Sequence, residues 1–100
     1  MLSTHPGPLI LRVIVANDQF AVLGWNNPTT GVSSPNYELR LEDEAGTRLD
    51  TLTVPRQDGD YQRNVQLPVP GAIYIVRLLS ISSSGNRQEI DNVIFRAGEI

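Results

Sequence analysis

The stretch LPVPGAIYIVRLLSISSSG, residues 67–85, decides the fold of this chain. It begins with two prolines and a glycine, continues through a run rich in Ile, Val, Leu and Tyr, and ends at a serine-glycine turn. This pattern is typical of a central β-strand that is bounded by turns at both ends. We therefore predict a strand over residues 72–82.

Six further segments have the composition of strands, and residues rich in Asn, Asp, Gly, Pro and Ser separate them. Residues 37–42 alternate most clearly, which predicts Tyr37 and Leu39 in the core and Glu38 in water. In the strand predicted at 20–25, we expect Trp25 to face the core. The other predicted strands cover residues 9–15, 47–54, 61–67 and 89–97.

Two of these strands carry details that the structure can test. In residues 9–15, alternation places Leu11, Val13 and Val15 on one face and Ile14 on the other. In residues 47–54, the leucines depart from strict alternation, which a β-bulge would explain. No segment has helical periodicity. The sequence therefore predicts an all-β protein, a seven-stranded antiparallel β-sandwich.

The length of the chain bounds the domain organisation. A chain of 100 residues fits one domain, and roughly 65% of its unfolded surface could be buried on folding. We expect a single domain over residues 1–100, in which residues 1–8 form an N-terminal extension. There is no cysteine, so neither disulfides nor thiolate metal sites contribute to stability.

Three short motifs follow one another in a characteristic order. Trp25 precedes Pro28 by three residues, Tyr37 opens the alternating strand, and Pro70-Gly71 precedes Tyr74 by a short spacing. Together they resemble a fibronectin type III domain of the immunoglobulin-like superfamily, and the resemblance covers nearly the whole chain.

The resemblance implies a Greek-key sandwich in which the Tyr74 hydroxyl pins the Pro70-Gly71 corner. One departure is that Leu67 lies three residues before Pro70, where the family usually has the leucine two residues before the proline. The corner would then be one residue longer. The sequence has no Arg-Gly-Asp motif, so integrin binding is not implied.

Charge and hydropathy argue against several classes of partner. The net charge is −3 and the eight basic residues, all arginine, are scattered, so we expect neither nucleic acid nor an anionic membrane as partner. The N-terminal residues lack a basic start and a long apolar run, which indicates no signal peptide and no membrane insertion.

Candidates for catalysis and metal binding are few. His5 lies in a Pro-Gly segment and has no second histidine with which to bind zinc. Two acidic clusters could contact calcium, but turn geometry explains them better. Four serines lack a neighbouring base. We expect no enzymatic activity, cofactor, bound metal or small-molecule substrate. The acidic clusters are Glu42-Asp43-Glu44 and Asp58-Gly59-Asp60, and the serines are Ser80, Ser82, Ser83 and Ser84.

The strand at 72–82 carries an apolar second face. If Tyr74, Val76, Leu78 and Ser80 point into the core, alternation turns four large aliphatic side chains outward around an arginine. A contiguous apolar face on a small domain usually marks an interface. The candidate partner-binding residues are Ile73, Ile75, Arg77, Leu79 and Ile81, with Ile90 and Ile94 of the last strand beside them. The alternative is a one-residue slip that exchanges the two faces.

These features indicate a structural or interaction subunit that packs through this sheet face, against a protein partner or against itself. By analogy of fold, it could be a phage virion decoration or tail component. The alternatives are a repeat excised from a multidomain extracellular or surface protein, acting as a spacer or adhesion module, and an engineered loop-binding scaffold. The long polar loop at residues 26–36 has no aromatic anchor, which argues against the scaffold.

Overall fold

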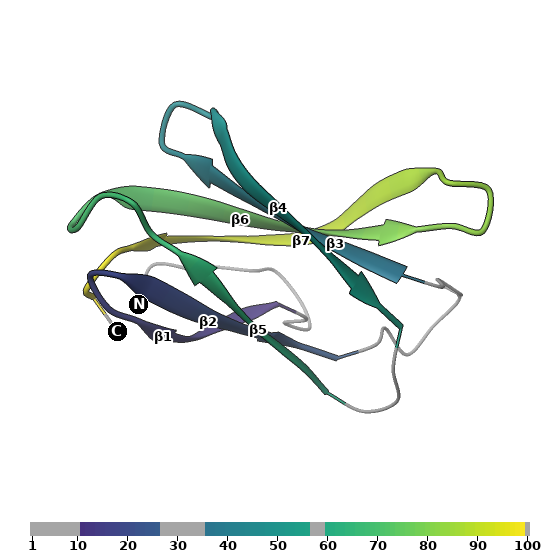
Figure 1. The fold of residues 1–100 in the computed structure, drawn as a ribbon, viewed down its shortest axis with the longest axis horizontal. Coiled ribbons are helices and arrows are strands. Elements are labelled where there is room, and N and C mark those ends of the chain that lie inside the picture. The colour runs from purple at the N-terminus through teal and green to yellow at the C-terminus, as the bar shows by residue number, and fades with distance from the viewer. Residues whose placement is uncertain (1–10, 27–35, 57–59, 100) are drawn as a thin grey trace.

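The computed structural model describes residues 11–26, 36–56 and 60–99. Seven strands run through these residues, and they confirm the predicted all-β fold (Figure 1). Pro28, His5, Ile10, the Asp58-Gly59 dipeptide, the segment 1–8 and most of the loop 26–36 lie outside the described residues. The strands are β1 (Arg12–Ala16), β2 (Phe20–Trp25), β3 (Asn36–Asp43), β4 (Arg48–Pro55), β5 (Tyr61–Gln66), β6 (Ile73–Ile81) and β7 (Arg87–Arg96).

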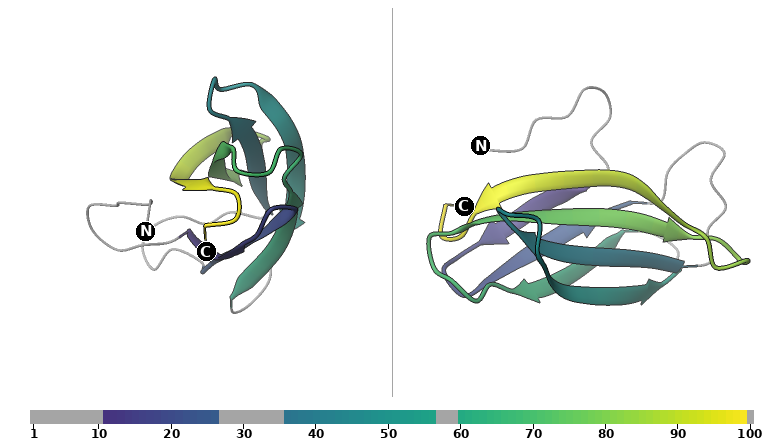
Figure 2. Two further views of the ribbon diagram at one scale, coloured as in Figure 1. Left: turned by 90° about the vertical axis from the view of Figure 1, so that its left-hand side faces the viewer. Right: turned by 90° about the horizontal axis from the view of Figure 1, so that it is seen from above.

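The strands form two antiparallel sheets that pack face to face as a sandwich (Figures 1 and 2). The three-stranded sheet has the order β1-β2-β5, and the four-stranded sheet has the order β4-β3-β6-β7. On one side of the sandwich the sheets are joined by the Leu11 N–H, which donates to Asp91 Oδ2 of β7 at 2.8 Å.

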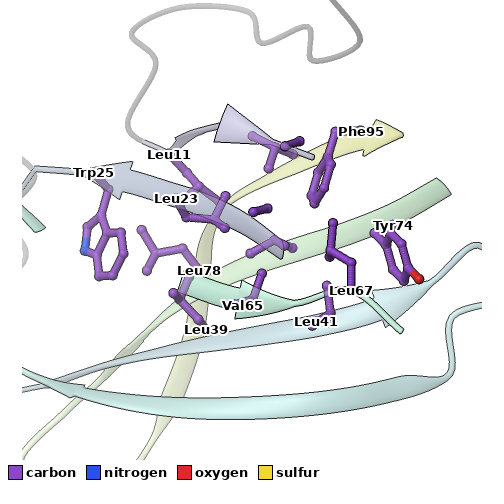
Figure 3. Close-up of a cluster of buried hydrophobic side chains, with 14 of the residues drawn as sticks. Leu11, Leu23, Trp25, Leu39, Leu41, Val65, Leu67, Tyr74, Leu78 and Phe95 are labelled. Atoms are coloured by element: carbon purple, nitrogen blue, oxygen red, sulfur yellow. The ribbon is translucent and has the colours of Figure 1, made fainter. Parts of the chain in front are cut away.

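The core lies between the sheets, and both contribute large side chains (Figure 3). Leu23 of β2 and Leu78 of β6 are both fully buried there. At one end, the Trp25 ring stacks on Tyr61 with centroids 5.0 Å apart. Tyr37 meets both rings edge-on, at 6.1 Å from Trp25 and 5.1 Å from Tyr61.

The faces of β6 follow the predicted alternation. Tyr74, Val76 and Leu78 are at most 1% exposed and belong to the core, and Ser80 is buried beside them. Ile73 and Ile75 lie half-buried on the outer side. The slipped alternative, with Ile73 and Ile75 in the core, is therefore excluded.

The Pro70-Gly71 corner is held by the Tyr74 side chain. Its hydroxyl accepts a hydrogen bond from the Val69 N–H at 2.7 Å and donates one to the Val69 carbonyl at 3.0 Å. Gly71 has a φ of 75°, in the left-handed region that glycine adopts without steric cost. The tyrosine thus satisfies both main-chain groups of one exposed residue and fixes the entry into β6.

The prediction for the first strand was wrong in register. A bulge between Val13 and Val15 shifts the pairing of β1 with β2, so that Val15 lies opposite Val22 and Ala16 lies opposite Ala21. Val15 is consequently 38% exposed, whereas Ala16 is fully buried. The extra residue of a bulge reverses the faces of every residue that follows it.

The bulge predicted in the fourth strand is confirmed. Asp50 pairs with Leu41, but Arg48 pairs with Glu42, which leaves Leu49 as the extra residue. Leu49 is 39% exposed. Leu52 returns to the inner face and packs against the core.

Candidate interaction surface

The outer face of the four-stranded sheet carries most of the residues predicted to bind a partner. Residues that pair directly across neighbouring strands share a face, so the pairing of β6 with β3 and β7 defines this surface. Its residues on these three strands are Ile73, Ile75, Arg77, Leu79 and Ile81 of β6, Glu38, Arg40 and Glu42 of β3, and Arg87, Glu89, Asn92, Ile94 and Arg96 of β7.

Six charged side chains on this face form an ion-pair cluster. They are Glu38, Arg40, Glu42, Arg77, Arg87 and Glu89. Arg77 Nε lies 3.0 Å from Glu42 Oε1, and its Nη1 lies 3.1 Å from Glu89 Oε1. These bonds, the one to Glu42 above all, raise the pKa of Arg77. The guanidinium thus joins β3 to β7 across β6. Its positive charge is balanced by two carboxylates of the same face.

Glu38 faces outward, but the prediction that it lies in water was wrong, because it is the most enclosed member of the ion-pair cluster, at 3% exposed. Arg87 Nε donates to Glu38 Oε1 at 2.8 Å, and Arg40 Nε donates to the other carboxylate oxygen. Leu79 lies directly opposite Glu38 and Glu89 and is only 5% exposed. Leu79 therefore faces outward as predicted, but the flanking charged side chains leave little of it for a partner.

The exposed apolar part of the face is a smaller set, which we name the isoleucine cluster: Ile73, Ile75 and Ile94. Ile75 and Ile94 pair directly across β6 and β7, and Ile94 is 46% exposed. Ile73 lies one outward position further along β6. Ile81 is half-buried at the other end of the strand, beyond Arg77 and Leu79.

Ile90 does not belong to this face. Strand β7 has a bulge here. Asp91 lies opposite Leu78 and Glu89 lies opposite Leu79, which leaves Ile90 of β7 as the extra residue. Ile90 is partly buried and packs against the core. Its predicted position beside the outward residues of β6 was wrong, because alternation counted from Ile94 does not hold across a bulge.

An open pocket adjoins the isoleucine cluster at the corner end of the sandwich. Ile73 forms part of its wall, together with the turn after β3, the corner before β6 and the end of β7. Arg96 Nη1 donates to the Gly71 carbonyl at 3.0 Å and Arg96 Nε lies 3.7 Å from Glu99, so two neighbours engage this guanidinium. The lining residues are Asp43, Glu44, Ala45, Gly71, Ala72, Ile73 and Arg96.

The three residues of the acidic triplet Glu42-Asp43-Glu44 have different surroundings. Glu42 is bound to Arg77, and Asp43 Oδ1 accepts hydrogen bonds from the N–H groups of Ala45 and Thr47 at 3.0 and 2.9 Å. This turn geometry is the role predicted for the triplet. Glu44 is exposed on the rim of the pocket and makes no hydrogen bond or ion pair with the rest of the described chain.

Two of the four candidate serines make hydrogen bonds within a turn. Ser82 Oγ lies 2.9 Å from Ser84 Oγ and accepts from the Asn86 N–H at 3.1 Å, within the turn between β6 and β7. Among the residues that the structure describes, no group of three acidic, His or Cys side chains could hold a metal ion. The described segments also contain no helix of the length and apolar character needed to cross a membrane.

The sheet edges are guarded against strand addition. Inward-pointing charges and bulges are the usual devices of this kind. On β5, Arg63 lies opposite the inward Leu23, and on β4, Asp50 lies opposite the inward Leu41. The strands β1 and β7 each contain a bulge. Contacts through a sheet face are therefore favoured over edge-to-edge pairing.

The enclosure of Glu38 predicts a pH dependence of stability. Burial alone would raise the pKa of this carboxyl, but the hydrogen bonds and charges of Arg87 and Arg40 outweigh it and lower the pKa below its ordinary value. The carboxylate thus contributes stability that is fully present above the unfolded pKa of about 4.3 and is lost as pH falls through the lower folded pKa. Glu38→Gln should lose stability at pH 7, and its stability should fall less steeply than that of the native chain below about pH 4.

Urea unfolding of both proteins between neutral and acidic pH measures this difference. Glu44→Gln is the matched control, because Glu44 is exposed and makes no ion pair with any residue that the structure describes. Equal acid slopes for the native chain and Glu38→Gln would contradict the assignment.

A scan against protein-family models finds no match, and a search of curated proteins finds no similar sequence.

Proposed function

We propose that this protein is a non-catalytic interaction module with a fibronectin type III-like fold, which packs into a larger assembly through the outer face of its four-stranded sheet. The observation that carries the proposal is the isoleucine cluster. Exposed aliphatic side chains on adjacent strands contribute to binding when a partner removes them from water. The guarded edges support a contact through the face.

Strand order and the corner support the family part of the proposal. The sheets β1-β2-β5 and β4-β3-β6-β7 pack as a two-sheet sandwich, the architecture that the resemblance implies. The Tyr74 hydroxyl bonds to Val69 across the Pro70-Gly71 corner, and Trp25 and Tyr37 pack together at the opposite end of the core. Each feature is weak alone, but they occur in one chain in the expected order.

Replacing Ile75 and Ile94 together by threonine tests the proposal. We expect the double variant to remain folded and to lose assembly, because both side chains point outward and threonine suits a strand. Light scattering over a range of concentrations measures the assembly. Val69→Thr is the matched control, because this side chain is 56% exposed and lies in the corner before β6, outside the face.

Retention of native assembly by the Ile75→Thr/Ile94→Thr variant would overturn the proposal. Assembly lost by the control variant as well would also overturn it, because the effect would then come from general surface polarity. Circular dichroism separates lost assembly from lost folding.

A further inference from the structure

The opposite side of the sandwich carries a second apolar surface, on the outer face of the three-stranded sheet. Ala21, Leu23 and Trp25 of β2 face the core, so Phe20 and Val22 face outward. Val15 pairs with Val22 on this side, and the bulge leaves Ile14 beside them, 39% exposed. Val22 is only 9% exposed, so the apolar side chains that reach the surface are Ile14, Val15 and the half-buried Phe20, and we name these three the β1–β2 patch.

The charge of this face is unusual. The outward residues of β5 are three amides, Gln62, Asn64 and Gln66, which pair across from β2. Arg12 is the only charged side chain that the described strands place on the face, and no carboxylate accompanies it. Its Nη1 makes one long hydrogen bond, 3.5 Å to Asn26 Oδ1.

The absence of a side chain at Gly24 allows the Arg12 guanidinium to lie close to the backbone of β2. A Cβ at Gly24 would lie 3.4 Å from Arg12 Cζ and 2.8 Å from Ile14 Cδ1, so the missing side chain leaves room for both. The arginine therefore lies against the backbone of β2 beside the apolar side chains. A partner that covers the β1–β2 patch would also cover this cation and must supply an anion to compensate for its loss of water.

The chain itself offers a surface of the matching kind. Glu44 is exposed on the rim of the pocket, without an ion pair in the described chain, and Ile73 lines the same pocket. The pocket holds two carboxylates, from Asp43 and Glu44, against one guanidinium that Glu99 and Gly71 already engage. Among the described residues, an apolar surface beside an anion without an ion pair thus lies on one side of the sandwich, and an apolar surface beside a cation without an ion pair lies on the other.

On both surfaces the charge lies within a few residues of the apolar set along the chain. Arg12 is three residues from Val15, which corresponds to about 10 Å along a strand. Glu44 is two residues beyond Glu42, the β3 partner of Ile75, so its Cα lies at most about 7 Å from that row. On each surface the charged residue lies at the edge of the aliphatic side chains. The aliphatic side chains of the two surfaces could therefore contact each other while the two charges pair beside them.

We propose that the occupant of the isoleucine cluster and its pocket is a second copy of this chain, which docks its β1–β2 patch there and places Arg12 against Glu44. This inference rests on the proposed function and names its partner. Because the two surfaces are different and lie on opposite faces of the sandwich (Figure 2), the contact is heterologous and repeats from copy to copy into a stack or a ring.

A charge exchange tests the contact. Arg12→Glu and Glu44→Arg should each weaken self-association at least about tenfold, because each brings like charges together. An equimolar mixture of the two variants should restore assembly, since each contact in an alternating stack then joins opposite charges. The double variant Arg12→Glu/Glu44→Arg should restore it as well. This double variant has the net charge of the native chain and is the matched control for net charge.

Sedimentation velocity over a range of concentrations measures these outcomes, and circular dichroism checks that the exposed substitutions leave the fold intact. A native chain that stays monomeric throughout overturns the proposal and leaves the isoleucine cluster for a foreign partner. Single reversals that assemble like the native chain, or a mixture and a double variant that stay dissociated, also overturn it. If Ile75→Thr/Ile94→Thr abolishes assembly while the charge variants have no effect, the proposed function stands and this pairing falls.

Discussion

Replacing Trp25 by alanine should lower the free energy of unfolding by about 3–5 kcal/mol, the largest loss that we expect from any single substitution in this chain. The side chain is fully buried, stacks on Tyr61 and meets Tyr37 edge-on. Alanine would forfeit these contacts and leave a cavity that the flanking tyrosines, held on β3 and β5, fill only in part. A loss of this size is a large fraction of the stability of a typical small domain.

Urea unfolding followed by far-ultraviolet circular dichroism measures the loss without depending on tryptophan fluorescence. Val69→Ala is the control, because Val69 is 56% exposed and contributes only its main-chain groups to the Tyr74 corner. It should change stability by less than about 0.5 kcal/mol. A loss below about 1 kcal/mol for Trp25→Ala would contradict the role of the three rings as a packed end of the core.

The indole N–H of Trp25 adds a refinement. Nε1 is buried and has no hydrogen-bond acceptor among the described residues. A buried donor without an acceptor costs about 1–3 kcal/mol. Trp25→Phe keeps an aromatic ring and removes the donor, so it should lose much less stability than Trp25→Ala.

Most of the fold could be predicted because local and long-range signals agree. The alternation in residues 37–42 places Tyr37, Leu39 and Leu41 in the core, and the structure buries all three. The turns around β6 are marked by proline, glycine and serine, and these fix where the strand begins and ends. Such residues report their backbone needs directly in the sequence.

The bulges limited the prediction. Val15 and Ile90 were assigned to the wrong faces because an extra residue in β1 and in β7 reverses the alternation after it. Only the bulge in β4 left a visible mark, since Leu49 breaks a polar and apolar alternation. In β1 and β7, apolar residues occur on both sides of the bulge and hide the change of phase.

The position of the candidate surface on the outer face of β6 could be predicted, but the exposure of its residues could not. The sequence indicated an apolar outer row on β6, but pairwise charges decide how much of it stays exposed. Glu38 and Arg87 are 49 residues apart and meet only because β3, β6 and β7 are neighbours. Within β6, Arg77 is the one charged residue in an otherwise aliphatic outer row. It was the only sign in that strand of the ion-pair cluster that encloses Leu79.

Leu78→Ala should lower the free energy of unfolding by about 2–5 kcal/mol, whereas Leu79→Ala should lower it by less than about 2 kcal/mol. Both leucines are at most 5% exposed, but Leu78 packs between the sheets and Leu79 lies under charged side chains on the outer face. A cavity at Leu79 opens toward water and mobile side chains, so it closes or fills more easily.

The two alanine variants differ by one position on one strand, so strand propensity cancels and urea unfolding compares the faces directly. Equal losses would show that the outer ion-pair cluster packs as tightly as the core. A larger loss for Leu79→Ala would contradict the assignment of faces on β6. If Leu79→Ala costs less stability than Leu78→Ala, substitutions on the outward side of β6 are less damaging than substitutions in the core. The residues of an interaction surface on that side can therefore change without loss of the fold.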